Sequence, residues 1–456
     1  MNYHLVNSIL KQDYSNLFLE QIKELDYLKE ISNISLNKHT ITIDRKDPFL
    51  VEKEIELYGN KIRMAIIEQV QSKISKYYKS PIIDKEAFEA KILFNYERSY
   101  SNDNLAKMAW ADILESSEVL LFSSGMATIS TILTSITSIF NNKCNCVILG
   151  KYFETLTISN LLQKIGVNIS QKIEENHVYN ILFLEPTKYS WKLENQDIEQ
   201  IKNQLLSKDI QFVIIDSTLS QDSRFANEIV TFINDGKLQN KYVIEIKSRL
   251  KLYQLGFEFC NLGSAEIYAT AHNDIKSISE YISKIRTVLG TTPDFFSLSM
   301  LEHPILNSQG LTEKYINTIF SNNKILRNYG KSSINTNFIT KISNKITGKP
   351  FTIIEIGDKK INNYAPIIDH LRLIQKEYLP CLFLGSSFGF RHHRYEMIIP
   401  DNRIDEAYLK FCPGYRKGPS FDLFCNYFSW LSQISSIEEF SNNTGIQSKF
   451  DTKQFD

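Results

Sequence analysis

Three segments of this 456-residue sequence place chemically capable residues directly after apolar, strand-like runs. The first segment is residues 123–128, Ser-Ser-Gly-Met-Ala-Thr, which follows the apolar run 119–122 and opens an apolar helical pattern. Small residues at such a turn direct backbone N–H groups at an anion, and the helix dipole adds to the attraction, so phosphate is the obvious candidate. The alternative interpretation is a tight turn in which a serine caps the helix.

The second segment places Asp216 at the end of the run 212–215, before Ser217 and Thr218. An aspartate at this position can hold a pyridinium nitrogen protonated, which makes the ring an electron sink for a substrate carbanion. It can equally be a helix cap or a metal ligand, so the residue alone leaves these roles open.

The third segment follows the run 242–246 and contains two lysines, Lys247 and Lys251. A lysine held at a strand end beside a phosphate pocket can have a lowered pKa and attack an aldehyde carbon. Both lysines compete for this role, and either one can be an ordinary surface charge. The choice between them depends on the residues around them.

Five short apolar runs indicate the element that positions these segments. They alternate with helical patterns between residues 95 and 290, and they are residues 119–122, 146–149, 181–184, 212–215 and 242–246. Runs of this kind predict a mostly parallel sheet covered on both faces, whose ligands bind beyond the carboxyl ends of the strands. We therefore expect an α/β fold with the three segments at one edge of the sheet.

The remaining sequence predicts an arm before this sheet and a smaller domain after it. Residues 40–43 alternate as in a short strand, and the apolar residues of 51–78 have helical spacing. Two strand-like stretches, 351–356 and 381–384, predict a smaller α+β domain. The expected division is an N-terminal arm and helix at 1–90, a large domain at 91–295 and a small C-terminal domain at 296–456.

Composition argues against several classes of protein. The 52 acidic and 52 basic residues balance, which favours a small-molecule ligand over nucleic acid or an anionic membrane. The six cysteines have neither paired spacing nor zinc-finger spacing with histidine, so we expect no disulfide scaffold and no metal site. Residues 1–20 do not resemble a signal peptide, no run of about 18 apolar residues occurs, and we expect a cytoplasmic protein.

The three segments, in this order, resemble the Cys/Met metabolism family of pyridoxal-5′-phosphate (PLP) enzymes, which includes cystathionine γ-synthase, cystathionine lyases and methionine γ-lyase. That family carries a Ser-Ser-Gly-Met loop, an Asp-x-Thr at a strand end, and Ser-x-Thr-Lys with the cofactor lysine last. Here Ser248-Arg249-Leu250-Lys251 matches the last motif, which selects Lys251 over Lys247. The resemblance implies a PLP-dependent transferase fold of type I, with a smaller C-terminal α+β domain.

The resemblance also implies which residues bind the cofactor and perform catalysis. Tyr152, in a segment similar to Tyr-Gly-x-Thr, would stack on the cofactor ring and carry protons together with Lys251, while Asp216 would hold the ring nitrogen. Tyr96 and Arg98 match a motif that reaches the phosphate of a neighbouring subunit, which implies a homodimer or homotetramer with shared active sites. The full expected cofactor set is Ser124, Gly125, Met126, Tyr152, Asp216, Thr218, Ser248, Lys251, Tyr96, Arg98 and Tyr189.

Several positions depart from the family pattern. Tyr189 stands where an asparagine contacts the cofactor, and Leu250 stands where a threonine donates to the phosphate. On the substrate side, Ser387 resembles a carboxylate-binding serine, but Lys410 replaces the arginine that forks onto that carboxylate. Lysine cannot make the same bidentate pair with a carboxylate. Either Lys410 therefore binds the substrate carboxylate as a point charge, or an arginine elsewhere in the chain binds it. The candidate arginines are Arg391, Arg394 and Arg416.

The expected function is that of a PLP-dependent lyase or transferase that eliminates or replaces a γ or β substituent of an amino acid, in specialised metabolism. The cofactor would be bound through a Schiff base to Lys251. One alternative is other PLP chemistry on the same fold, namely aminotransfer, decarboxylation or carbon–carbon bond formation. A second alternative is a pseudoenzyme that keeps the fold without the chemistry.

Overall fold

The structure is a computed structural model, and two compact units make it up. The sheet unit contains residues 67–254 and 258–313, and the terminal unit contains residues 1–66, 255–257 and 314–456. The residues that the structure describes are 3–36, 41–43, 46–74, 84–87, 90–93, 103–110, 117–141, 143–150, 152–190, 192–236, 238, 241–269, 275–331, 338–343, 348–357, 360–399 and 406–446. Each unit is described by itself.

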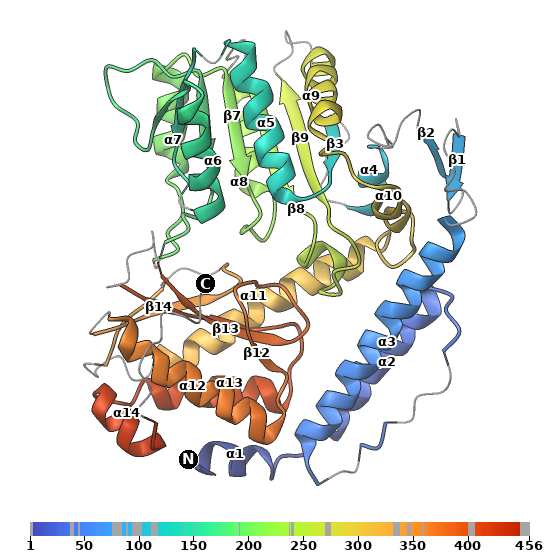
Figure 1. The fold of residues 1–456 in the computed structure, drawn as a ribbon, viewed down its shortest axis with the longest axis vertical. Coiled ribbons are helices and arrows are strands. Elements are labelled where there is room, and N and C mark those ends of the chain that lie inside the picture. The colour runs from blue at the N-terminus through green and yellow to red at the C-terminus, as the bar shows by residue number, and fades with distance from the viewer. Residues whose placement is uncertain are drawn as a thin grey trace. The chain divides into compact units, whose positions relative to one another are not determined.

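A seven-stranded sheet forms the centre of the sheet unit, in the order β3-β9-β8-β7-β6-β4-β5. Figure 1 labels its strands β3, β7, β8 and β9. Its strands are β3 (Glu118–Phe122), β4 (Asn145–Ile148), β5 (Asn168–Ser170), β6 (Ile181–Leu184), β7 (Phe212–Asp216), β8 (Tyr242–Ser248) and β9 (Gly263–Ala269). A separate hairpin consists of β1 (Asp84–Ala87) and β2 (Ala90–Leu93).

The direction of the strands brings several strand ends to one edge. Neighbouring strands from β8 through β5 run parallel, whereas β9 is antiparallel to both of its neighbours, β3 and β8. Strand β3 therefore runs in the same direction as β8, and Phe122 and Ser248 both pair with Gly263. The carboxyl ends of β3, β4, β6, β7 and β8 lie at this edge.

Helices cover both faces of the sheet, as continuous apolar strands require. One face packs against α5 (Gly125–Ile139), α6 (Phe153–Lys164) and α9 (Ile275–Leu289). The other face packs against α7 (Ile198–Ser207) and α8 (Arg224–Asp235). The remaining helices of this unit are α4 (Leu105–Ala109), the 3₁₀ turn η1 (Leu252–Gln254) and α10 (Phe295–Leu301).

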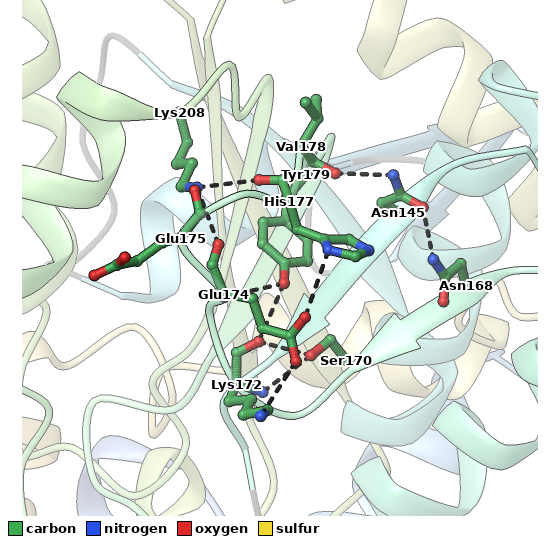
Figure 2. A network of polar contacts seen from close by, with 10 residues as sticks. All are labelled: Asn145, Asn168, Ser170, Lys172, Glu174, Glu175, His177, Val178, Tyr179 and Lys208. Atoms are coloured by element: carbon green, nitrogen blue, oxygen red, sulfur yellow. Dashed lines mark hydrogen bonds and ion pairs between the residues drawn. The ribbon is translucent and has the colours of Figure 1, made fainter.

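A polar network fixes the opposite, amino-terminal edge of the sheet (Figure 2). Asn145, at the start of β4, donates its side-chain amide to Val178 O at 2.8 Å. Lys208 Nζ donates to three carbonyl oxygens of one loop, those of Glu174, Glu175 and His177. Because these carbonyl groups converge on one ammonium group, the network ties this loop to the end of α7.

The terminal unit contains a smaller five-stranded sheet in the order β10-β11-β14-β13-β12. These strands are β10 (Ile339–Ile342), β11 (Thr352–Ile356), β12 (Leu382–Leu384), β13 (His393–Ile398) and β14 (Tyr408–Cys412), with only β12 and β13 paired in parallel. The helices α12 (Ile361–Tyr378), α13 (Pro419–Leu431) and α14 (Ile437–Thr444) belong to this unit, as do α1 (Tyr3–Ile9) and α2 (Ser15–Ile31). Helices α3 (Pro48–Ile74) and α11 (Gln309–Lys331) cross the division between the units.

Buried polar contacts join the N-terminal helices to the C-terminal part of the same unit. Glu52, on α3, accepts hydrogen bonds from the backbone N–H and the hydroxyl of Ser420, at the start of α13. Tyr14 donates to Asp422 Oδ2 at 2.7 Å. The N-terminal segment is therefore an integral part of the terminal unit.

The structure confirms the predicted α/β class, with a mostly parallel central sheet and a smaller second sheet. The helix predicted at 51–78 is observed to Ile74, and residues 75–78 lie outside the described residues. The strand predicted at 40–43 is wrong for residues 41–43, which form no strand, and residue 40 is not described. The division at 90 and 295 stays a prediction.

Two observations concern the disulfide scaffold and the membrane-spanning segment that were considered from the composition. All six cysteines are free and buried. Among the residues that the structure describes, no helix combines the length and the apolar character needed to cross a bilayer.

Candidate functional site

The three sequence segments meet at the carboxyl-terminal edge of the large sheet. The backbone N–H of Ser248 donates to Thr218 Oγ1 at 3.0 Å, which joins the ends of β8 and β7. A Cβ atom added to Gly125 would lie 2.9 Å from Ser248 Cβ, so the first turn of α5 packs directly on Ser248. Only glycine allows this approach, and the geometry therefore brings Gly125, Thr218 and Ser248 together.

A second glycine fixes the start of α5 from the neighbouring strand. A Cβ atom on Gly263 would lie 2.4 Å from both Ser124 O and Thr128 Oγ1. Ser124 caps the helix by accepting from the N–H of Ala127 at 3.0 Å, and its carbonyl accepts from Thr128. The first N–H groups of a helix have no intrahelical acceptor. Those of Gly125 and Met126 therefore point out of the helix end, where an anion would be favoured.

Asp216 is the buried carboxylate of this edge. It is 8% exposed, and its Oδ1 accepts a hydrogen bond from the N–H of Thr218 at 3.0 Å. Burial raises the pKa of Asp216, although the hydrogen bonds from Thr218 act in the opposite direction. A cationic ring nitrogen that paired with Asp216 would offset this cost of burial, because an opposite charge favours the ionised carboxyl.

The two lysines of the third segment have different environments. Lys247 is 1% exposed, forms an ion pair with Glu245 Oε1 at 3.3 Å and donates to Ser223 Oγ. Lys251 follows β8 and lies half-buried at the turn before η1. The side chain of Lys247 is thus committed to a buried ion pair within the sheet, and the choice of Lys251 as the cofactor lysine stays a prediction.

Two tyrosines flank the strand ends β4 and β6. The rings of Tyr152 and Tyr189 are half-buried and contact each other edge to face, with centroids 5.2 Å apart at 83°. Burial raises the pKa of the Tyr152 hydroxyl, with nearby carboxylates, Glu154 and Asp216 among them, acting in the same direction. Tyr152 is therefore a neutral hydrogen-bond donor at ordinary pH.

The sequence analysis gave Glu185 no role, yet its carboxylate accepts hydrogen bonds from the backbone of both tyrosines. Its Oε1 accepts from the N–H of Tyr152 at 3.2 Å, and its Oε2 accepts from the N–H of Tyr189 at 3.5 Å. Gly150 leaves the space, since a Cβ there would lie 2.5 Å from Glu185 Oε1. The signal in the sequence is a glutamate that directly follows the apolar run 181–184.

The expected carboxylate-binding residues lie in the terminal unit, and several are engaged by acidic side chains. Arg391 pairs with Glu24 at 2.8 Å, and Arg416 pairs with Glu56 at 3.2 Å. Burial would raise the pKa of Glu56, but the charge of Arg416 and its other neighbours lower it to about 2. These two arginines therefore anchor the N-terminal helices α2 and α3.

Lys410 and Arg394 have different partners from these arginines. Lys410 lies on β14 with its Nζ 3.4 Å from Glu396 Oε2 and 4.6 Å from the centroid of the Phe351 ring, and it donates to Ser386 O. The guanidinium of Arg394 lies over the Phe390 ring and is half exposed. Ser387 follows Ser386 in the loop after β12.

Tyr96 and Arg98, expected to reach the phosphate of a neighbouring subunit, lie outside the described residues. Their roles stay a prediction.

The fold defines a class of α/β protein, and other solved structures have a similar fold. A methionine γ-lyase from Micromonospora echinospora matches with a TM-score of 0.52 and 13% identity, over 76% of this chain and 93% of that one. A cystathionine γ-lyase from Lactobacillus plantarum, complexed with L-serine, matches with a TM-score of 0.52 and 14% identity, over 88% and 98%. A cystathionine γ-lyase from yeast matches with a TM-score of 0.51 and 18% identity, over 75% and 88%.

These likenesses confirm the predicted fold class, fold type I. At such identities they show the fold alone. No family model and no curated protein matches the sequence.

Proposed function

We propose that this protein is a PLP-dependent enzyme, a lyase or transferase that eliminates or replaces a γ or β substituent of an amino acid. One observation carries the proposal: the first turn of α5, Asp216 and the segment of Lys251 meet at one edge of a fold type I sheet. The γ-lyases among the similar structures support the reaction class.

The residues at this edge fit the cofactor. The N–H groups of Gly125 and Met126 suit its phosphate, the buried carboxylate of Asp216 suits its ring nitrogen, and the amine of Lys251 suits its aldehyde. When bound, PLP forms a covalent bond with an amino group and withdraws electrons from the carbon beside it. In this proposal Ser124, Thr218 and Ser248 complete the cradle through the contacts described above.

The chain's own residues would perform the proton movements. Lys251 Nζ would take the proton from the α carbon of the substrate and deliver it further along the substrate. Tyr152 stays neutral, so it orients groups by donating a hydrogen bond and exchanges a proton only where a base lies beside it. Asp216 remains ionised when it faces a cationic nitrogen, and Tyr189 offers a donor in place of the family's asparagine.

The substrate side is proposed to differ from that of the family. Ser387, Lys410, Arg391 and Arg416 remain candidates for the substrate carboxylate, but a substrate would compete with Glu396 for Lys410 and with Glu24 and Glu56 for the arginines. This competition supports an unusual amino-acid substrate in specialised metabolism. A homodimer or homotetramer and a cytoplasmic location belong to the same proposal, and the six free cysteines fit a reducing compartment.

The test is a panel of amino acids with γ or β leaving groups, offered to protein that has been loaded with PLP. The expected products are a released thiol, carboxylate or halide with ammonia and a keto acid, or a substituted amino acid when a nucleophile is added. Lys251→Ala is the matched inactive variant. Products of aminotransfer or decarboxylation, with no loss of the side-chain substituent, would contradict the reaction class but leave the cofactor in place.

A further inference from the structure

Arg249 lies between Ser248 and Lys251 in the proposed cofactor segment, and its environment is unusual for a residue in a turn. It is fully buried. Its guanidinium carbon lies 4.6 Å from the centroid of the Trp110 ring and 4.2 Å from that of Tyr253. The two rings are 74° apart in orientation, so the guanidinium contacts both and gains a cation–π attraction from them.

Two hydrogen bonds fix the orientation of the same guanidinium. Nε donates to Ser264 Oγ at 2.8 Å, and Nη2 donates to Glu266 Oε1 at 3.1 Å. Glu266 also accepts from the hydroxyl of Tyr268 at 2.7 Å. Ser264 and Glu266 both lie on β9, so the side chain of Arg249 fastens the end of β8 to the neighbouring strand.

The backbone around Arg249 is fixed as well. Its N–H donates to Leu262 O at 2.9 Å, and its carbonyl accepts from Gln254 Nε2 at 2.9 Å. The buried Gln254 side chain also donates to the carbonyl of Cys260 and accepts from its N–H. Lys251 is thus presented on a short turn that is fastened by a buried side chain on each side.

We infer that Arg249 is a positioning residue, whose guanidinium, ion-paired and held against two aromatic rings, fixes the turn that presents the amine of Lys251. The inference rests on the proposed function. A covalent reaction between Lys251 and an aldehyde depends on the position of the amine, and a misplacement of 1 Å can cost roughly 10²-fold in rate. Arg249 need not touch the cofactor, because it acts through the turn.

The test compares Arg249→Met with the wild-type chain. The readouts are the rate and the dissociation constant of PLP binding, followed by the visible absorption band of the lysine-bound cofactor, and the pH at which that band titrates. We expect the variant to form the band about tenfold to hundredfold more slowly, with a displaced titration pH. Arg249→Lys is expected to recover little, since the single ammonium of lysine cannot reproduce the planar, two-nitrogen contact with Ser264 and Glu266.

Removal of Arg249 also takes away the cation that pairs with the buried Glu266, which can impair folding. The double variant Arg249→Met with Glu266→Gln removes that charge. We expect it to recover the thermal midpoint but not the rate of band formation. The matched control is Lys241→Met. Lys241 is a buried cation that donates to Ile210 O at 2.7 Å, and it directly precedes β8, the strand that Arg249 follows. The control variant should lower stability without changing the band.

Two results would overturn the inference while leaving the proposed function intact: a normal band, formed at the normal rate, in Arg249→Met, or a double variant that recovers both stability and rate. A wild-type chain that forms no band with PLP would overturn the proposed function itself and the inference with it.

Discussion

The backbone N–H of Ser248 donates to the hydroxyl oxygen of Thr218 at 3.0 Å, although 30 residues separate the two positions in the chain. This bond joins the segment that carries Asp216 to the segment that carries Lys251. Because Thr218 also donates its own N–H to Asp216 Oδ1, one threonine organises both sides of the proposed cofactor site.

Thr218→Val should weaken PLP binding, since valine keeps the shape of threonine but removes the acceptor. A hydrogen bond of this kind contributes about 1 kcal/mol, so the dissociation constant for PLP should rise about fivefold in an equilibrium titration. Thr218→Ser retains the hydroxyl and serves as the control. Equal weakening in the serine and valine variants would contradict the role given to the hydroxyl.

Lys247→Met should destabilise the fold without preventing attachment of the cofactor. The substitution leaves Glu245 buried without its cation, and breaking a buried pair in this way costs about 3–5 kcal/mol. Urea unfolding measures the loss, and adding Glu245→Gln to the variant should restore most of it. A Lys247 variant of normal stability that fails to bind PLP would reverse the assignment of the two lysines.

Asp216→Asn should stabilise the protein without cofactor, and the gain should grow with pH. Burial raises the pKa of Asp216 in the folded chain, so the wild-type protein loses stability as pH rises from the ordinary carboxyl value through the raised one. Asparagine has no such ionisation. Urea midpoints of both proteins, measured without PLP at acidic and neutral pH, give the comparison.

With PLP bound, the wild type should be more stable than Asp216→Asn, because only the aspartate can pair with a cationic ring nitrogen. An Asp216→Asn variant that gains as much stability from PLP as the wild type does would contradict the pairing.

Glu52 should make the terminal unit less stable as pH rises through neutrality. Burial raises the pKa of Glu52 to about 7, against the hydrogen bonds from Ser420, which lower it. The stability that a protonated Glu52 contributes is complete below the ordinary pKa of a glutamate and is lost as pH rises through about 7. Glu52→Gln should remove this dependence, which urea unfolding at pH values on both sides of 7 would measure. Parallel pH profiles for the variant and the wild type would contradict the prediction.

Much of the large sheet could be predicted because its strands are continuously apolar. The run 212–215 lies within β7 and the run 242–246 within β8, both of which are covered by helices on two faces. Strand β9 lacks this signal, because Glu266 and several small residues interrupt its apolar pattern. Residues 41–43 alternate like a strand but do not form one, since pairing depends on a partner that local pattern does not reveal.

Some features of the candidate site could also be predicted from the sequence, and others could not. The positions of Lys251, Asp216 and the loop before α5 after strands could be predicted because each lies in a short motif that follows an apolar run. Their roles stay a prediction. The ion pairs of Arg391 with Glu24 and of Arg416 with Glu56 could not be predicted, because they join residues that lie hundreds of positions apart. Likewise, the burial of Lys247 against Glu245 depends on which face of β8 packs inward.

The most direct test of the central claim is the identity of the lysine that binds PLP. Wild-type protein, Lys251→Ala and Lys247→Ala would each be incubated with PLP, reduced with borohydride to make the linkage permanent, digested and mapped by mass spectrometry. We expect stoichiometric modification of Lys251 in the wild type and in Lys247→Ala, and none at this site in Lys251→Ala. Specific modification of Lys247, or scattered labelling of surface lysines with no visible absorption band, would contradict the claim.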